Sequence, residues 1–303
     1  MTTFAAPAWA RSITNEQFAL FQRLVHREAG IYLSDAKRAL LVGRLLRRLR
    51  GTGIDSFEAY YRLVEADPEE RVRMLDCICT NETQFFREPR QFAFLEEKAC
   101  VDWERAASAG KHPRRLRVWS AGCSTGEEPY SLAMSLLAHL PPSRGWELEI
   151  LGTDLSTGAL EKARRAVWPI ERAAQIPAPL LKRFMLRGVG AQAGRMRAGS
   201  ETRAVVELQR LNLNDPPYPV EGPFDLVLCR NVLIYFDRAG KERVIHRLVD
   251  CLAPGGYLML GHAESLCGVT ARTRSVGPSV YVRLPGGAAG HAEPSPGRGE
   301  SSR

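Results

Sequence analysis

Hydrophobic residues recur at helical spacing through residues 11 to 90, which predicts an all-helical N-terminal domain. One run covers residues 18–25 and a longer one covers 41–49, with apolar positions three or four residues apart. Short polar residues, the usual caps of helix N-termini, precede these runs and two later ones: Thr14 or Asn15, Ser34 with Asp35, Ser56, and Asp67. Gly51 and Gly53 are expected to end the second helix.

The end of this region, residues 80–88, combines short polar side chains with two aromatic residues and Arg87. Such a stretch can line a pocket, with the aromatic rings buried and Arg87 facing an anion. It can equally be an ordinary helix end, and the sequence alone leaves both interpretations open.

From Leu116 onward the pattern changes to alternating strands and helices, which is typical of an α/β fold with a mostly parallel sheet. Strands are predicted at 116–119, 148–153, 224–229, 257–260 and 280–282, within a second domain spanning 91–284. Residues 168–212 interrupt the alternation with glycine turns and two short predicted strands, 195–197 and 205–208. We therefore expect a small antiparallel insert there. The tail, 285–303, is rich in Gly, Pro and Ser and is expected to be disordered.

A loop of small residues lies between the first predicted strand and its helix. Ala121, Gly122, Ser124 and Gly126 allow a backbone to approach a ligand closely, as in the first turn of nucleotide-binding α/β folds. The spacing is neither G-x-G-x-x-G nor a P-loop, and the acids at 127 and 128 disfavour phosphate. The loop therefore favours a cationic nucleoside without phosphates, S-adenosylmethionine. The alternative is a structural turn that places acids near a helix N-terminus.

Polar residues follow the ends of other predicted strands. Asp154 ends the strand at 148–153, where a carboxylate can accept hydrogen bonds from ribose hydroxyls. Ligands bind such sheets at the carboxyl ends of the strands. We therefore expect Ala121, Asp154 and Asn231 to converge at one edge of the sheet.

Composition limits the classes of protein that fit. The 303 residues are 45% hydrophobic and 25% charged, which is typical of a globular protein. No apolar run has the length of a membrane span, and residues 1–10 do not resemble a secretory signal, so membrane insertion is not expected. Seven scattered cysteines suit reduced thiols in the cytoplasm and predict no metal site. The net charge of +8 favours acidic partners.

Two features bear on those partners. Lys37, Arg44, Arg47 and Arg48 fall largely on the side of the second helix away from its leucines. They form either a solvated face or a docking surface for an acidic helix or a phosphate backbone. The sequence D-P-P-Y at 215–218 resembles the catalytic loop of methyltransferases that act on bases. It precedes the strand at 224–229 instead of following it, so we interpret it as a proline-stiffened loop and expect no nucleic-acid substrate.

Five stretches in order resemble the bacterial chemotaxis receptor glutamate methyltransferases. They are T-N-E-T-Q-F-F-R-E from 80, W-S-A-G-C-S-T-G-E-E-P-Y-S from 119, T-D at 153, F-D-L-V-L-C-R-N-V-L-I-Y-F-D from 224 and L-A-P-G-G-Y-L from 252. The resemblance covers residues 11–284. It implies a Rossmann-like S-adenosylmethionine-dependent methyltransferase domain with a small antiparallel β insert, preceded by an all-α domain. It also implies methyl transfer to glutamates on cytoplasmic receptor helices, with S-adenosylhomocysteine as product.

The resemblance assigns roles to individual positions. Positions that match the family's cofactor-binding residues are Asn81, Thr83, Arg87, Glu128, Asp154, Asn212, Leu213, Arg230 and Asn231. Arg87 and Tyr235 match positions proposed to act near the transferred methyl. One departure is Gly122-Cys123, where some members carry Ala-Ala. Some members also bind a receptor's C-terminal pentapeptide at the insert, a question that the sequence leaves open here.

The expected chemistry needs no general base, because a glutamate side chain with a pKa of about 4.3 is already ionised at neutral pH. Alignment of the reacting atoms and removal of water are the enzyme's tasks. Two alternatives remain: a nucleic-acid methyltransferase, and a non-catalytic receptor-binding adaptor on the same scaffold. Intact Arg87, Glu128, Asp154 and Tyr235 argue against the adaptor.

Overall fold

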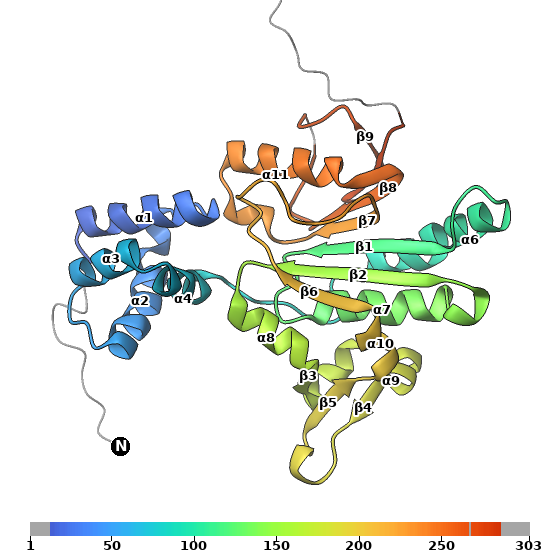
Figure 1. The fold of residues 1–303 in the computed structure, drawn as a ribbon, viewed down its shortest axis with the longest axis horizontal. Helices are drawn as coiled ribbons and strands as arrows, with labels where there is room; N and C mark the ends of the chain where they lie inside the picture. Colours follow the sequence, from blue (N-terminus) through green and yellow to red (C-terminus); the bar gives the residue numbers. More distant parts are fainter. Residues whose placement is uncertain (1–12, 267, 286–303) are drawn as a thin grey trace, which may run out of the picture.

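The N-terminal helices of the computed structural model, which describes residues 13–266 and 268–285, pack around their own apolar core (Figure 1). They are α1 (Asn15–Ala29), α2 (Arg38–Thr52), α3 (Phe57–Ala66) and α4 (Pro68–Ile78), with a short 3₁₀ turn, η2 (Asp35–Lys37), before α2. The predicted caps Thr14, Ser56 and Asp67 are confirmed, since each side chain accepts a backbone N–H of its helix. Ser34 makes no such bond.

The segment from Cys79 to Arg87 is not helical, so the expectation of helix throughout 11–90 is wrong at its end. Cys79 is already extended, and the next helix, α5 (Pro89–Phe94), continues through the π-helical turn η3 (Leu95–Ala99) into α6 (Cys100–Ser108). Phe85 and Phe86 pack in the core of the sheet, not in that of the four helices. A domain boundary at residue 90 therefore stays a proposal.

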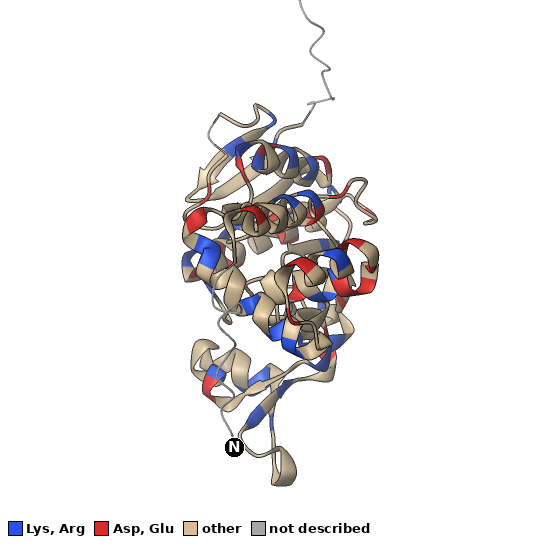
Figure 2. Cartoon of the chain, turned by 90° about the vertical axis from the view of Figure 1, so that its left-hand side faces the viewer, with Lys and Arg blue, Asp and Glu red and all other residues tan. Residues whose placement is uncertain are grey.

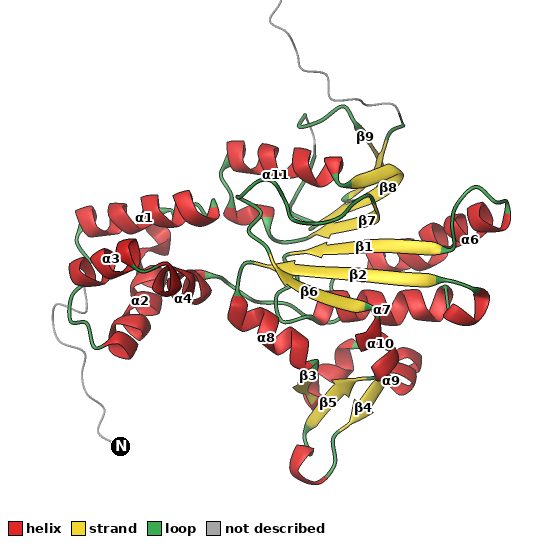
Figure 3. Ribbon diagram, in the orientation of Figure 1, coloured by secondary structure: helices red, strands yellow, loops and turns green. Residues whose placement is uncertain are grey.

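A seven-stranded sheet forms the second part of the molecule, in the order β6-β2-β1-β7-β8-β10-β9 (Figure 3). The strands are β1 (Arg115–Ala121), β2 (Glu147–Asp154), β6 (Val206–Arg210), β7 (Phe224–Cys229), β8 (Leu252–Leu260), β9 (Thr273–Gly277) and β10 (Val280–Arg283). The first five in spatial order are parallel, and β10 runs antiparallel to β8. This is the predicted Rossmann-like sheet.

Alternate residues of the central strands pack into two separate apolar cores, one on each face of the sheet, and helices cover both faces. Val118 and Leu226 pack with α7 (Glu127–His139) and with α5 and α6, whereas Trp119 and Val227 pack with α11 (Arg238–Asp250). Alternating side chains of a strand point to opposite faces, so a strand buried on both sides reads as continuously apolar.

The predicted antiparallel insert exists, but its composition differs from the prediction. Its three strands, in the order β3-β5-β4, are β3 (Val167–Pro169), β5 (Arg195–Ala198) and β4 (Met185–Arg187). It also carries η5 (Ile170–Gln175), α9 (Ala178–Phe184), η6 (Gly190–Gln192) and α10 (Ser200–Ala204). The stretch 205–208, expected in this insert, instead contributes to β6, which pairs with β2 at the edge of the main sheet. A short apolar run does not reveal which sheet it joins.

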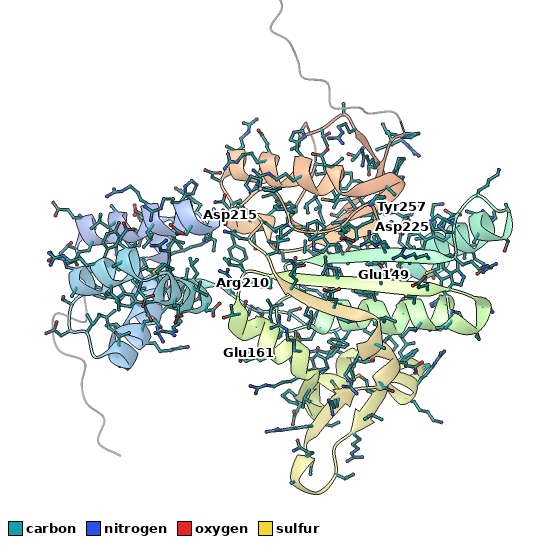
Figure 4. All side chains as sticks on the ribbon, viewed as in Figure 1. Glu149, Glu161, Arg210, Asp215, Asp225 and Tyr257 are labelled. Carbon is teal, nitrogen blue, oxygen red and sulfur yellow. The ribbon has the colours of Figure 1, made fainter. Side chains whose placement is uncertain are left out.

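The four N-terminal helices, α1 to α4, which we call the helical part, are attached at the carboxyl ends of the parallel strands. Figure 1 shows the arrowheads of β1 and β2 pointing toward it, and Figure 4 places Arg210 and Asp215 on the same side. Ile31 forms a β-bridge with Phe236, and the Tyr32 N–H donates to the Tyr235 carbonyl over 2.7 Å. A side chain at Gly30, whose φ is +67°, would place its Cβ 2.6 Å from the Phe236 ring. Glycine is therefore required at this junction.

A second junction links α4 to α8 (Thr157–Arg165). Asp76 accepts hydrogen bonds from both the backbone N–H and the hydroxyl of Thr157. Together the two junctions fix the N-terminal helices over the strand ends. The tail that was predicted to be disordered lies, beyond Pro285, outside the described residues.

Candidate active site

A cavity of about 290 Å³ lies between the four helices and the carboxyl ends of the strands. It is lined by all ten residues to which the family resemblance assigned a role: Asn81, Thr83, Arg87, Glu128, Asp154, Asn212, Leu213, Arg230, Asn231 and Tyr235. Ala121 is fully buried, and the next residue, Gly122, lines the cavity in its place. The predicted convergence at one sheet edge is therefore confirmed for Asp154 and Asn231.

Strained backbone gathers at this cavity. Of the six non-glycine residues with positive φ among those described, Ser124 and Asn231 line the cavity, and Phe86 and Glu88 flank Arg87. Left-handed backbone costs about 1–3 kcal/mol per non-glycine residue and persists where the surroundings enforce it. The surroundings therefore enforce an unusual backbone conformation at Asn231 and on both sides of Arg87.

Asp154 holds the small-residue loop closed. One carboxylate oxygen accepts the Ser124 N–H and the other accepts the Ser156 N–H, each over 2.8 Å. Burial raises the pKa of Asp154 above its usual value, and these two N–H groups offset the rise in part. A carboxylate offers about four acceptor sites, so two remain for a ligand.

Glu128 and Arg230 form a buried ion pair that the sequence did not reveal. The Arg230 side chain is 1% exposed, and its Nε donates to Glu128 over 2.7 Å. Its Nη1 donates to the Arg87 carbonyl over 2.6 Å and lies 3.8 Å from Glu88. Glu128 also accepts the Ser120 hydroxyl over 2.7 Å. Much of the Arg230 guanidinium is thus committed to protein groups, so its main role in this structure is to hold Glu128 and the Arg87 backbone.

Arg87 and Tyr235 reach the cavity from different segments. The Arg87 Nη2 donates to the Asn231 side-chain oxygen over 2.8 Å, and Nη1 donates to the Glu82 carbonyl over 3.3 Å. The Lys37 ammonium lies over the Tyr235 ring, 5.5 Å from the ring centroid. Lys37 belongs to the helical part, so both parts of the chain supply cations to this cavity.

The other predicted residues build the walls. The Asn212 side chain donates to the Glu28 carbonyl of α1 over 2.6 Å, so it ties the cavity wall to the helices. Leu213 is buried, and its carbonyl accepts the Tyr218 hydroxyl over 2.7 Å. The Asn81 carbonyl accepts the Ser124 hydroxyl over 3.0 Å. Tyr218 of the D-P-P-Y sequence packs edge-on against Trp119, which agrees with a structural loop.

Glu264 is a residue of this region that sequence reasoning missed. Its carboxylate is buried and accepts the N–H groups of Asn231, Ile234 and Gly261 over 2.9, 3.2 and 2.8 Å. It therefore holds the loop after β7 against the end of β8. The one available signal was an acid placed just after a strand that ends at the ligand edge.

The basic face of α2 differs from the prediction. Arg48 donates two hydrogen bonds to Glu70, a side chain only 2% exposed, and Tyr60 donates a third over 2.8 Å. Arg44 donates to the Ile78 carbonyl and to the Thr80 hydroxyl. The interpretation of a solvated face is wrong for these two arginines, because α4 covers that side of α2, with its buried Glu70 against Arg48 and its last residue, Ile78, against Arg44. Figure 2, which looks onto the helical part, shows basic and acidic residues interspersed.

The chemistry of the cavity fits S-adenosylmethionine. Two carboxylates, Glu128 and Asp154, suit an ammonium group and a ribose, side-chain amides suit polar atoms, and Leu211, Leu213 and Val232 supply apolar walls for a purine ring. Among the described helices, none could span a lipid bilayer.

Comparisons with known proteins agree with this fit. Residues 16–79 match the all-alpha domain of the CheR methyltransferases, and residues 81–282 match their SAM binding domain. Chemotaxis protein methyltransferase 2 of Pseudomonas aeruginosa is 39% identical over 272 residues, covering 88% of this chain and 93% of that protein. The chemotaxis protein methyltransferases of Salmonella typhimurium and Escherichia coli are each 36% identical over 274 residues, covering 89% of this chain and 91% and 92% of theirs. The chain therefore belongs to the CheR methyltransferase family.

Proposed function

We propose that this chain transfers a methyl group from S-adenosylmethionine to glutamate side chains of chemotaxis receptors, giving methyl esters. The observation that carries the proposal is that one cavity at the strand ends gathers every residue that matches the family's site positions. Membership of a family of chemotaxis methyltransferases supplies the substrate class.

Asp154 and Glu128 hold the methyl donor in this proposal. Asp154 has two free acceptor sites for ribose hydroxyls, and Glu128 offers its remaining acceptor sites to the ammonium group. Leu211, Leu213 and Val232 contact the adenine, while Asn81, Thr83, Asn212 and Asn231 complete the polar lining. When bound, the donor supplies a methyl group activated by a positively charged sulfur.

The chain's own residues then have three tasks. The substrate glutamate is already ionised near neutral pH, so no base is needed. Arg87 orients the carboxylate through its planar fork, which is held by Asn231 and the Glu82 carbonyl. Tyr235 contacts the carboxylate or the donor from the other side, and the cavity between the two parts of the chain excludes water. Correct alignment can contribute roughly 7–11 kcal/mol to lowering the barrier.

The partners in this proposal are the cytoplasmic helices of methyl-accepting receptors, which places the enzyme in the cytoplasm. Of the four cations first considered for docking, Lys37 lines the cavity and Arg47 is exposed, so these two are proposed to contact an acidic receptor helix. Arg44 and Arg48 act instead by fixing α2 to α4. Binding of a receptor's C-terminal peptide at the insert remains a separate proposal, for which the exposed Leu186 and Val189 offer apolar contacts.

The test is methylation of receptor-containing membranes with tritiated S-adenosylmethionine. We expect radioactivity in the receptor band that is released as methanol by base, because carboxyl esters hydrolyse under those conditions. DNA and RNA in parallel reactions should remain unlabelled. An inactive protein that still binds receptor, but shows no binding of S-adenosylhomocysteine by calorimetry, would establish the adaptor alternative.

A further inference from the structure

Exposed apolar side chains concentrate around the mouth of the cavity. Among the described residues, six large apolar side chains are exposed, and three of them lie here: Tyr32 at 57%, Leu40 at 45% and Ile234 at 46%. Leu40 and Ile234 line the cavity, and Tyr32 is bonded through its backbone N–H to the Tyr235 carbonyl. We call these three residues the apolar rim. A cluster of this kind on a folded protein marks a surface that another molecule covers.

The apolar rim is held in place from both parts of the chain. Ile31, next to Tyr32, bridges to Phe236, and the Ile234 N–H donates to the buried Glu264 over 3.2 Å. Leu40 lies in the first turn of α2. Because the backbone at all three positions is fixed, the exposure of their side chains is a property of the fold.

Charges beside the rim restrict the kind of partner. Lys37 lines the cavity and stands over the Tyr235 ring, and Arg47 is exposed on α2, whereas Arg44 and Arg48 are bonded to α4. Glu82 is an exposed acid that also lines the cavity. A surface with apolar contacts at its centre and cations beside it is complementary to an acidic amphipathic helix.

We propose that the apolar rim binds apolar side chains of the receptor helix one turn away from the glutamate to be methylated. This inference rests on the proposed function. On a helix, residues three and four positions apart share a face, so a glutamate that enters the cavity presents those neighbours to its mouth. The rim therefore selects among receptor glutamates: one with apolar neighbours at these positions is methylated, and one with charged neighbours is a poor substrate.

The experiment uses a double variant that carries both Tyr32→Ser and Leu40→Ser, and Val101→Ser is its control. Val101, on α6, is 46% exposed and belongs to neither the cavity nor the rim. With receptor-containing membranes and tritiated S-adenosylmethionine, we expect the double variant to raise the KM for receptor about tenfold. Its Kd for S-adenosylhomocysteine, measured by calorimetry, should change less than twofold. The control should match the wild type in both measurements.

A second measurement changes the receptor and leaves the enzyme intact. Lysine in place of the apolar residues three and four positions from a methylated glutamate should abolish labelling at that site and spare the receptor's other sites. The inference is overturned if the double variant has an unchanged KM for receptor, or if the lysine substitutions in the receptor leave labelling of the adjacent glutamate unchanged. A concentration-dependent dimer in the ultracentrifuge that the double variant dissociates also overturns it, since a second copy then covers the rim. Wild-type enzyme that labels no receptor refutes the proposed function instead.

Discussion

Replacement of Asp154 by alanine is the most direct test of how the methyl donor is held. The two hydrogen bonds proposed to run from ribose hydroxyls to this carboxylate would be charge-assisted, and bonds of that kind contribute about 1.5–3 kcal/mol each. Taking the lower value for both, the variant loses about 3 kcal/mol of binding free energy. At about 1.4 kcal/mol per factor of ten, its Kd for S-adenosylhomocysteine rises roughly 100-fold.

The same substitution also releases the Ser124 and Ser156 N–H groups that Asp154 now binds, so loosening of the loop must be separated from loss of the ribose contact. Calorimetry with S-adenosylhomocysteine and with its 2′,3′-dideoxy analogue does so. If the carboxylate binds the ribose, wild-type protein loses affinity for the analogue, whereas the variant binds both ligands alike. Asp55→Ala, at an exposed position, serves as the control. A variant with an intact melting transition and a Kd within threefold of the wild type would refute the reasoning.

Acid provides an independent check on Asp154. Because burial holds the pKa of this carboxyl above its usual value, it protonates at a higher pH than an aspartate in water. The affinity for S-adenosylhomocysteine should therefore be constant near neutral pH and fall as the pH drops through that raised pKa. Asp154→Ala, which has no carboxylate to lose, should lack this decline. An identical acid dependence in both proteins would assign the titration to another group.

Three further predictions concern neighbouring groups. Arg87→Ala should lower the methylation rate with both substrates saturating by roughly 10- to 100-fold, and Arg87→Lys should not restore it, because lysine lacks the planar fork; a near-normal rate would remove Arg87 from the mechanism. Glu264→Gln, which places an amide NH₂ against N–H donors, should lower the single-turnover rate at least tenfold by displacing the loop after β7, while the exposed Glu207→Gln should not. Arg48→Met should cost about 3 kcal/mol of unfolding free energy at pH 7, because it removes two charge-assisted hydrogen bonds from the buried Glu70, which then keeps only the Tyr60 hydroxyl and Arg73 at 3.6 Å. Burial alone would raise the pKa of Glu70, but the hydrogen bonds from Arg48 and Tyr60 outweigh burial and lower this pKa in the folded protein. The stability is therefore present above about pH 4.3, the pKa of an unfolded glutamate, and is lost as the pH falls through the lower pKa of folded Glu70. Equal melting curves of the variant and the wild type at pH 7 would contradict the prediction.

The sequence predicted the elements and the edge of the sheet where the site lies, because both follow from local rules. Cap residues such as Thr14 and Asp67 act within one turn, and the alternation of strands and helices determines which strand ends meet. The roles of single positions came from the family resemblance, since composition and spacing do not separate a ribose ligand from a structural acid.

Contacts between distant segments were not predictable in this way. Arg48 looked like a solvated cation because helical spacing places it away from the leucines, yet Glu70 of α4 lies opposite it. Arg230 and Glu128 are 102 positions apart, and nothing local marks them as a pair. Val206 has the same local pattern whether its strand joins the insert or the main sheet. In each case the missing information is which surfaces pack together.

The acidic and basic residues that line the cavity come from different segments of the chain. Glu128 lies in the first turn of α7 and Asp154 at the end of β2. Lys37 comes from the N-terminal helices, and Arg87 lies, with the exposed Glu82, on the segment that connects those helices to the sheet. The proposed reaction brings a cationic donor and an anionic glutamate into one cavity, so carboxylates around the donor and the cations Lys37 and Arg87 around the glutamate favour each substrate in its own place. Arg230, buried against Glu128 and 3.8 Å from Glu88, limits the repulsion between those acids without presenting its charge to the glutamate.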